Sequence, residues 1–123
     1  MSDTPVAERL QVKRGRTLAV VDAPPEVDRA IGVEGARADG ASADVVLAFV
    51  RDRAQFDTAM AEVLPRIGAS AILWLGYPKL TSPLAGNLHR DVIHRIATDH
   101  GLAGVGLIAI DADWSAMRFK RGA

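Results

Sequence analysis

The sequence contains no cysteine. Disulfide bonds, thiolate zinc sites and thiol nucleophiles are therefore excluded. Acidic and basic residues balance at 15 each, so the formal net charge is zero and the chain has no bulk attraction for nucleic acid or anionic membranes. Because a cysteine-free chain fits a reducing compartment, we expect a cytoplasmic protein.

Long hydrophobic runs are also missing. Residues 1–16 lack an apolar run of signal-peptide length, and no segment is long enough to cross a membrane. No linker, low-complexity tract or internal repeat divides the 123 residues. With 49% hydrophobic and 24% charged residues, the composition is that of a globular protein. We expect residues 1–123 to form a single α/β domain.

Several segments have the apolar, β-branched character of strands. Residues 44–50, DVVLAFV, are apolar after the first position, as expected of a strand that is covered on both faces. Residues 33–38 form a weaker candidate, and the sequence of 33–43 does not define a structure. The main predicted strands are 17–21, 44–50, 70–77, 103–110 and 114–121.

Helical patterns alternate with these strands. Asp52 and Gln55 have the spacing of a capping box, and Pro65 is expected to end the helix that they begin. In the amphipathic segment after the fourth strand, Asn87 is expected to cap the helix and Gly101 to adopt the left-handed turn at its end. The predicted helices are 4–10, the residues after Pro25, 53–64 and 87–100.

This alternation predicts a three-layer α/β domain with a doubly wound, mostly parallel sheet of five to six strands. The Asp-Ala-Asp link at 111–113 is too short to contain a crossover helix. The last two strands are therefore expected to form an antiparallel hairpin or a mixed edge of the sheet.

Two resemblances narrow this prediction. A doubly wound sheet that ends in an antiparallel hairpin resembles the Rossmann-like class I methyltransferase architecture, in which the last strand usually lies between its two predecessors. The segments WLGYPK (74–79) and AIDADWSAMRFKR (109–121) resemble the pattern of a family of short bacterial proteins of unknown function. That resemblance implies a fold and assigns no catalytic residue. The matching residues are Trp74, Tyr77, Pro78, Lys79, Asp111, Trp114, Ser115, Arg118 and Phe119.

The methyltransferase resemblance implies an adenosyl-methionine site at a glycine-rich turn after the first strand. Here the turn reads Asp22-Ala23-Pro24-Pro25. The two prolines remove two N–H donors and fix two φ angles, and the conformational freedom of glycine is missing. The acidic residue that the resemblance places near the end of the next strand is Glu34 or Asp39, by position only. We therefore expect no cofactor, and no adenosyl-methionine in particular.

A ligand crevice is expected beyond the carboxyl ends of the parallel strands, as in other open α/β sheets. There Lys79 can hold an anionic group, and Trp114 or Tyr77 can stack on a ring. A small polar or anionic ligand is one interpretation, and ordinary loop and packing roles are the other. The candidate ligand-binding residues are Asp22, Arg51, Tyr77, Lys79, Thr81, Ser82, Asp111 and Trp114.

Neither a metal site nor a catalytic residue is predicted. Asp111 and Asp113 are two residues apart in a tight turn, where aspartate is favoured by hydrogen bonds to its own backbone. His89 and His94 are five apart, so they point to different sides of a helix. No nucleophile stands at a motif spacing from a histidine.

Three functions follow from these patterns. We prefer a non-enzymatic module that binds a small ligand or another protein through the crevice. The first alternative is a small enzyme, related to methyltransferases, that uses Lys79, Ser82 and Asp111. The second is a structural protein that self-associates as a homo-oligomer. The basic runs 13–16 and 118–121 are interpreted as solvated ends, so we expect neither a nucleic-acid partner nor a membrane partner.

Overall fold

The computed structural model describes residues 10, 12, 16–32, 37–38, 42–68, 71–79, 82–83 and 88–121. The helix predicted over 4–10 and the candidate Thr81 lie outside these residues, apart from Leu10.

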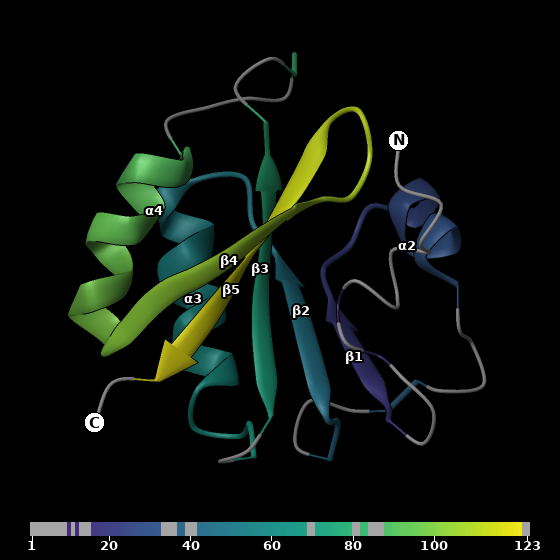
Figure 1. Ribbon diagram of the computed structural model, residues 1–123, viewed down its shortest axis with the longest axis horizontal. Helices are drawn as coiled ribbons and strands as arrows, with labels where there is room; N and C mark the ends of the chain where they lie inside the picture. Colours follow the sequence, from purple (N-terminus) through teal and green to yellow (C-terminus); the bar gives the residue numbers. More distant parts are fainter. Residues whose placement is uncertain are drawn as a thin grey trace.

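Five strands form one sheet in the order β1-β2-β3-β5-β4. β1 (Leu18–Val21), β2 (Val45–Phe49) and β3 (Ile72–Pro78) are parallel. β5 (Trp114–Arg121) is antiparallel to both β3 and β4 (Leu102–Ala109). Figure 1 shows β4 and β5 crossing the other strands obliquely. The predicted hairpin is confirmed, and its second strand lies between its two predecessors.

The chain reverses its direction across the sheet at β1. Leu18 is paired in parallel with Val45 of β2, and it also forms a parallel bridge to Arg37. The Leu18 carbonyl accepts a hydrogen bond from Ala38 N at 3.0 Å, and this carbonyl points away from β2. The chain therefore passes outward from β1 to Arg37 and returns to β2 on the other side. Arg37 is a described part of the weak strand predicted over 33–38.

The α-helices α2 (Pro25–Ile31), α3 (Arg53–Val63) and α4 (Arg90–Ala97) connect these strands, and the 3-10 turn η2 (Thr98–His100) extends α4. As predicted, the Asp52 carboxylate caps α3 by accepting from Gln55 N at 2.8 Å. None of the helices in the described part of the chain has the length and apolar character that crossing a membrane requires.

The prediction that Asn87 caps the fourth-strand helix is wrong. α4 begins at Arg90, and its N-cap is His89, which has extended dihedral angles. Leu88, just before it, is fully buried. We attribute the later start of the helix to this burial, because the extended backbone carries Leu88 into the core. At the other end, Gly101 adopts the expected left-handed conformation with φ 72°.

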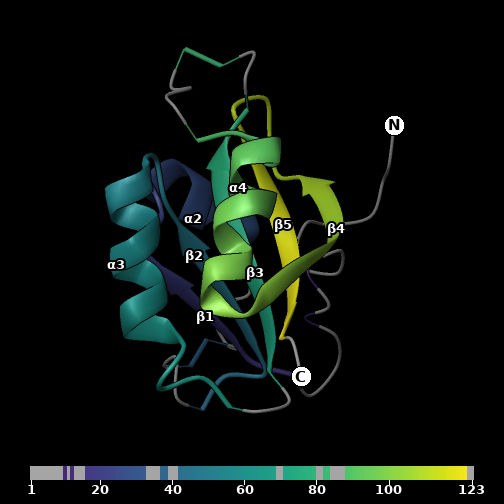
Figure 2. The ribbon, with the colours of Figure 1, turned by 90° about the vertical axis from the view of Figure 1, so that its left-hand side faces the viewer.

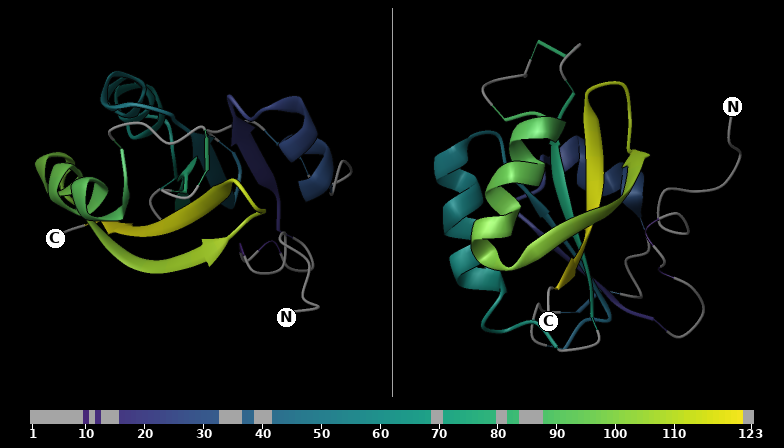
Figure 3. Two further views of the ribbon diagram at one scale, coloured as in Figure 1. Left: turned by 90° about the horizontal axis from the view of Figure 1, so that it is seen from above. Right: turned by 60° about the vertical axis from the view of Figure 1, so that its left-hand side comes forward.

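Helices cover both faces of the sheet. One buried cluster combines α3 and α4 with side chains such as Val46, Leu75 and Met117 of the sheet. The other combines α2, Leu10 and the opposite face of the strands. Figure 2 shows α3 and α4 beside each other, and the left panel of Figure 3 shows α2 apart from them. All of β2 is buried, so the three-layer prediction is confirmed.

β4 is the edge strand next to β5. Its pairing shifts register between Gly104 and Gly106, which marks a β-bulge. Val105 and Leu107 are 54% and 46% exposed and are the large hydrophobic residues exposed within the described chain. Both exposed hydrophobic residues therefore lie at or directly beside the bulge.

We predict that Phe56→Ala lowers the free energy of unfolding by about 3–5 kcal/mol, because it leaves a cavity under α3. Phe56 is fully buried in the cluster shared by α3 and α4. Urea denaturation measures the change. As the control, Val105→Ala at an exposed position should change the free energy by no more than about 0.5 kcal/mol. Equal losses in the two variants would contradict the assignment of the core.

Candidate ligand-binding site

A pocket of about 280 Å³ opens at the carboxyl ends of β1 and β2, along one side of α3. We call it the α3 groove. Its volume is close to the lower end of the range of about 300–1,000 Å³ that is typical of small-molecule sites. It lies where the strand order reverses, which is where open α/β sheets bind ligands. Its lining residues are Asp22, Pro24, Phe49, Arg51, Ala54, Gln55, Thr58, Ala59, Glu62 and Trp114.

α3 supplies the long wall of the groove. Its lining residues run from Ala54 to Glu62 with spacings that place them on one side of a helix. At 1.5 Å per residue this stripe is about 12 Å long. Because α3 returns along the sheet from the end of β2, Arg51 lies at the rim of the groove and Glu62 at its far end. The groove is therefore elongated, with opposite charges at its two ends.

Aromatic rings form a second wall. The ring centroids of Phe49 and Trp114 are 5.3 Å apart in an edge-to-face arrangement. A Cβ atom at Gly76 would lie only 2.8 Å from the Phe49 ring, so glycine at this position leaves room for the ring. The wall thus joins the end of β2 to the start of β5. It depends on the close approach of the Phe49 ring to Gly76 of β3.

The turn before β5 fixes the position of Trp114. The Asp111 carboxylate accepts hydrogen bonds from the N–H groups of Asp113 and Trp114, both at 2.8 Å. The Trp114 carbonyl accepts from Ile110 N at 2.9 Å and from Asp111 N at 3.2 Å. Asp111 therefore holds the turn, as its spacing suggested, and it does not line the groove.

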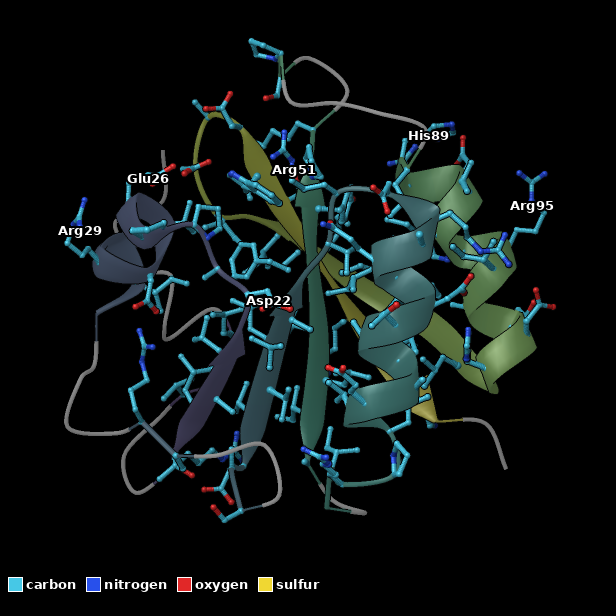
Figure 4. The ribbon with its side chains drawn as sticks, turned by 180° about the vertical axis from the view of Figure 1, so that it is seen from behind. Asp22, Glu26, Arg29, Arg51, His89 and Arg95 are labelled. Carbon is cyan, nitrogen blue, oxygen red and sulfur yellow. The ribbon has the colours of Figure 1, made fainter. Side chains whose placement is uncertain are left out.

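Charged side chains in the groove lack partners. Within the described residues, neither the carboxylates of Asp22 and Glu62 nor the guanidinium of Arg51 forms a hydrogen bond or an ion pair. In Figure 4, Asp22 and Arg51 lie near the sheet, whereas Glu26 and Arg29 project outward from α2. All three residues are exposed, so water solvates their charges, whereas Phe49 and Trp114 are only 4% and 3% exposed.

Asp22 has an unfavourable backbone conformation. Its φ is 58°, the only positive φ of a non-glycine residue in the described part of the chain. A left-handed residue with a Cβ costs energy, although aspartate tolerates it better than most residues do. Such strain is concentrated at functional sites in many proteins. Here the residue with the positive φ, Asp22, is one of those that line the groove.

The other predicted site residues form a separate group. Lys79 N donates to the Asp113 carbonyl at 2.8 Å, and Ser82 Oγ donates to the Asp113 carboxylate at 2.9 Å. These bonds tie the segment after β3 to the turn before β5. No ion pair between Lys79 and Asp111 is present in the described residues. The structure thus brings Asp22, Arg51 and Trp114 together in the groove, and it places Lys79, Ser82 and Asp111 in the adjoining loops.

Tyr77 does not line the groove either. Its ring is buried in the core cluster that includes α4. Its hydroxyl has no hydrogen-bond partner among the described residues. Burial raises the pKa of Tyr77 above its ordinary value of 10.0, and the nearby Arg90 guanidinium partly opposes this shift.

Sequence reasoning missed most of the α3 wall. The sequence predicts Gln55 only as part of a capping box, and it predicts no role for Thr58 or Glu62. Phe49 is a strand residue that is only 4% exposed, and it lines the groove nevertheless. The spacing of Ala54, Thr58 and Glu62 is a detectable signal, since small and polar residues four apart mark a helix side that no apolar layer covers.

In the described part of the chain, no group of three or more histidine or acidic side chains is arranged to hold a metal ion.

Solved structures of similar fold are methyltransferase-like. LepI in complex with SAM aligns with a TM-score of 0.54 at 14% identity over 94% of this chain. The ribosomal protein L11 methylase of Lactobacillus delbrueckii subsp. bulgaricus aligns with a TM-score of 0.55 at 12% identity over 94% of this chain. The N-methyltransferase NodS of Bradyrhizobium japonicum aligns with a TM-score of 0.51 at 15% identity over 98% of this chain.

These likenesses establish the fold. The chain has a methyltransferase-like, Rossmann-like α/β fold, as its sequence predicted. It spans 39% of the LepI chain, 74% of the L11 methylase and 82% of NodS. Neither a protein-family model nor a curated protein sequence matches it.

We predict that Tyr77 titrates above pH 10.0 and that Arg90→Ala raises its pKa further, because the opposing positive charge is removed. Tyr77 is the only tyrosine of the sequence, so its ultraviolet absorbance reports it directly. Arg95→Ala, on the same helix, should leave the titration unchanged. Ionisation at or below the ordinary value would contradict the prediction.

The raised pKa also implies an alkaline loss of stability. The unfolded chain releases the tyrosine proton near pH 10.0, before the folded chain does. The contribution of Tyr77 is thus fully present below that pH and is lost as the pH rises through the folded pKa. We predict that the melting temperature of Tyr77→Phe falls less steeply above pH 10 than that of the wild type. Thermal melts across this pH range measure the difference. Parallel pH dependences in the two proteins would disprove it.

We predict that Asp22→Gly stabilises the fold by about 1 kcal/mol, because glycine adopts a positive φ without the Cβ penalty. The matched control is Gly101→Ala, which introduces a Cβ at φ 72° and should destabilise by a similar amount. Denaturant unfolding measures both variants. A loss of stability in Asp22→Gly would show that Asp22 is not strained.

Proposed function

We propose that this protein binds a small adenosyl compound in the α3 groove. The observation that supports the proposal is one pocket, placed at the chain reversal, that combines an aromatic wall with unpaired Asp22, Arg51 and Glu62 side chains. A flat ring packs on the wall, a cationic group faces a carboxylate and an anionic group faces the guanidinium. Adenosyl derivatives of amino acids carry all of these groups in one elongated molecule.

The β1–α2 turn restricts how such a ligand is held. Pro24 and Pro25 have no N–H groups, and the Pro24 carbonyl already accepts from Val27 N at 3.0 Å and from Asp28 N at 2.9 Å. The turn therefore offers little to a carboxylate, and we assign the anionic end of the ligand to Arg51. Our expectation of no cofactor rested on this turn alone, whereas the side chains of the groove supply a different set of contacts.

Methyl transfer is a second candidate function. It is favoured by the solved structures of similar fold, which include an L11 methylase and an N-methyltransferase. Adenosyl-methionine would supply a methyl group, and the groove of this chain would bind and orient the donor. The Lys79, Ser82 and Asp111 set of our enzyme alternative adjoins the groove through the turn before β5, so its proposed part is to shape the rim. The non-enzymatic interpretation requires the same binding without turnover.

The remaining expectations complete the proposal. We propose a cytoplasmic location, a relationship to the family of short bacterial proteins with the Tyr-Pro-Lys and Asp-Trp-Ser pattern, and function without nucleic acid or membrane. A homo-oligomer is compatible with ligand binding because the groove does not involve the β4 edge.

Isothermal titration calorimetry tests the proposal with adenosyl-methionine, adenosyl-homocysteine and adenosine. We expect binding of the two amino-acid derivatives to weaken by about tenfold or more in Arg51→Ala, since a hydrogen bond to a charged group is lost. Adenosine, which has no carboxylate, should bind equally well to the wild type and to this variant. Asp22→Asn should weaken the binding of every compound that places a cation or a hydroxyl group beside the Asp22 carboxylate.

The matched controls are Arg29→Ala and Glu26→Gln on the outer side of α2, which should bind like the wild type (Figure 4). Absence of measurable heat with every adenosyl compound, or equal losses in Arg29→Ala and Arg51→Ala, would reject the proposal. Formation of adenosyl-homocysteine from adenosyl-methionine when a nucleophilic methyl acceptor is supplied, with the acceptor taking the methyl group and releasing a proton, distinguishes an enzyme from a binding module.

A further inference from the structure

Gln55 departs from the ordinary capping box at the start of α3. The Asp52 carboxylate accepts from Gln55 N at 2.8 Å, which is the usual first half of this motif. In the usual second half, the side chain at the third helical position accepts from the N–H of the N-cap residue itself. Here Gln55 Oε1 accepts instead from the N–H of Arg51, the residue before the N-cap, at 2.7 Å. The Gln55 side chain therefore holds a residue that lines the α3 groove.

The direction of the Arg51 N–H follows from β2. Alternate N–H groups of a strand point to opposite neighbours. Val45 N donates toward β1, to a carbonyl at 3.0 Å, and Val50 N donates to a β3 carbonyl at 2.9 Å. By this alternation the Arg51 N–H points to the side on which β1 lies.

β1 no longer runs beside β2 at that level. Val21, the last residue of β1, lies opposite Ala48, three residues before Arg51. The next residue, Asp22, has a φ of 58°, and the chain turns there toward α2. The Gln55 oxygen thus accepts the N–H that would otherwise have been offered to a further residue of β1. It does so at the point where the end of β1 opens the groove.

This bond fixes the backbone from which the Arg51 side chain leaves. Arg51 and Gln55 are both exposed, but Phe56, the next residue of α3, is fully buried and anchors the helix. A residue that is held before the ligand arrives loses less conformational freedom when it binds. The bond to Gln55 therefore favours binding by the Arg51 guanidinium without adding a contact to the ligand.

We propose that Gln55 is a positioning residue, whose amide oxygen holds the Arg51 backbone so that the guanidinium can receive a ligand carboxylate at the rim of the groove. This inference rests on the proposed function, in which Arg51 takes the anionic end of an adenosyl ligand. It adds that Gln55 contributes to a preference for adenosyl derivatives of amino acids over adenosine.

Calorimetric titration with adenosyl-homocysteine and adenosine tests the effect on the ligand. Gln55→Met has a side chain of similar length without the accepting oxygen, so it should fold and bind adenosyl-homocysteine about two- to tenfold more weakly. The binding of adenosine, which has no carboxylate, should not change. In an Arg51→Ala background, Gln55→Met should cause no further loss, because Gln55 acts through Arg51. Thr58→Ala, at a groove position with no described bond to Arg51, is the matched control, and its effect should be equal in both backgrounds.

Amide hydrogen exchange tests the bond itself without any ligand. The Arg51 N–H should exchange about two- to tenfold faster in Gln55→Met than in the wild type. Gln55→Glu retains an accepting oxygen, so it should restore slow exchange at Arg51.

The outcomes separate this inference from the proposed function. The positioning role alone is overturned if the wild type binds adenosyl-homocysteine and Gln55→Met binds it equally well. It is also overturned if Gln55→Met weakens adenosine by the same factor, if its loss adds to that of Arg51→Ala, or if the Arg51 N–H exchanges at the wild-type rate. Absence of heat with every adenosyl compound in the wild type would reject both proposals.

Discussion

The pairing of β1 on both of its sides is the constraint from which the groove arises. The Thr17 carbonyl accepts from Val45 N of β2 on one side, and the Leu18 carbonyl accepts from Ala38 N of the Arg37 segment on the other. The chain must therefore leave β1 in one direction and continue from β2 in the opposite one. Their connecting segments then lie on opposite faces, with α2 in one buried cluster and α3 in the other. The ends of these two strands are left uncovered between the segments.

Several contacts hold this reversal in place. The Arg37 guanidinium pairs with the Asp28 carboxylate at 2.7 Å and donates to the Gly32 carbonyl at 2.8 Å, which joins the returning segment to α2. The Asp44 carboxylate accepts from Thr17 N at 3.0 Å and so aligns the starts of β1 and β2. Since Val21 lies opposite Ala48, Asp22 leaves β1 at the level of Phe49, and Arg51 follows two residues further along the chain. The geometry of the groove therefore depends on the strand register as well as on the residues that line it.

The sequence predicted the fold well because its signals are local. An apolar β2, the Asp52 cap and a link too short for a helix each depend on a few neighbouring residues, and each was confirmed. The start of α4 was misplaced because the burial of Leu88, a tertiary effect, competed with the capping preference of Asn87. Of the candidate residues at the strand ends, Asp22, Arg51 and Trp114 line the groove, and their role in binding a ligand stays a prediction. The α3 wall was missed because the depth of a groove depends on how far α3 lies from β1, which no local pattern encodes.

The bulge in β4 has a consequence for neighbours in solution. An edge strand with free N–H and C=O groups and no charged side chain would ordinarily invite another chain to extend the sheet. The register shift between Gly104 and Gly106 moves the side chains of the two halves to different faces and interrupts the row of backbone groups. An incoming straight strand can match only one half at a time, so the bulge opposes extension of the sheet by further copies at this edge.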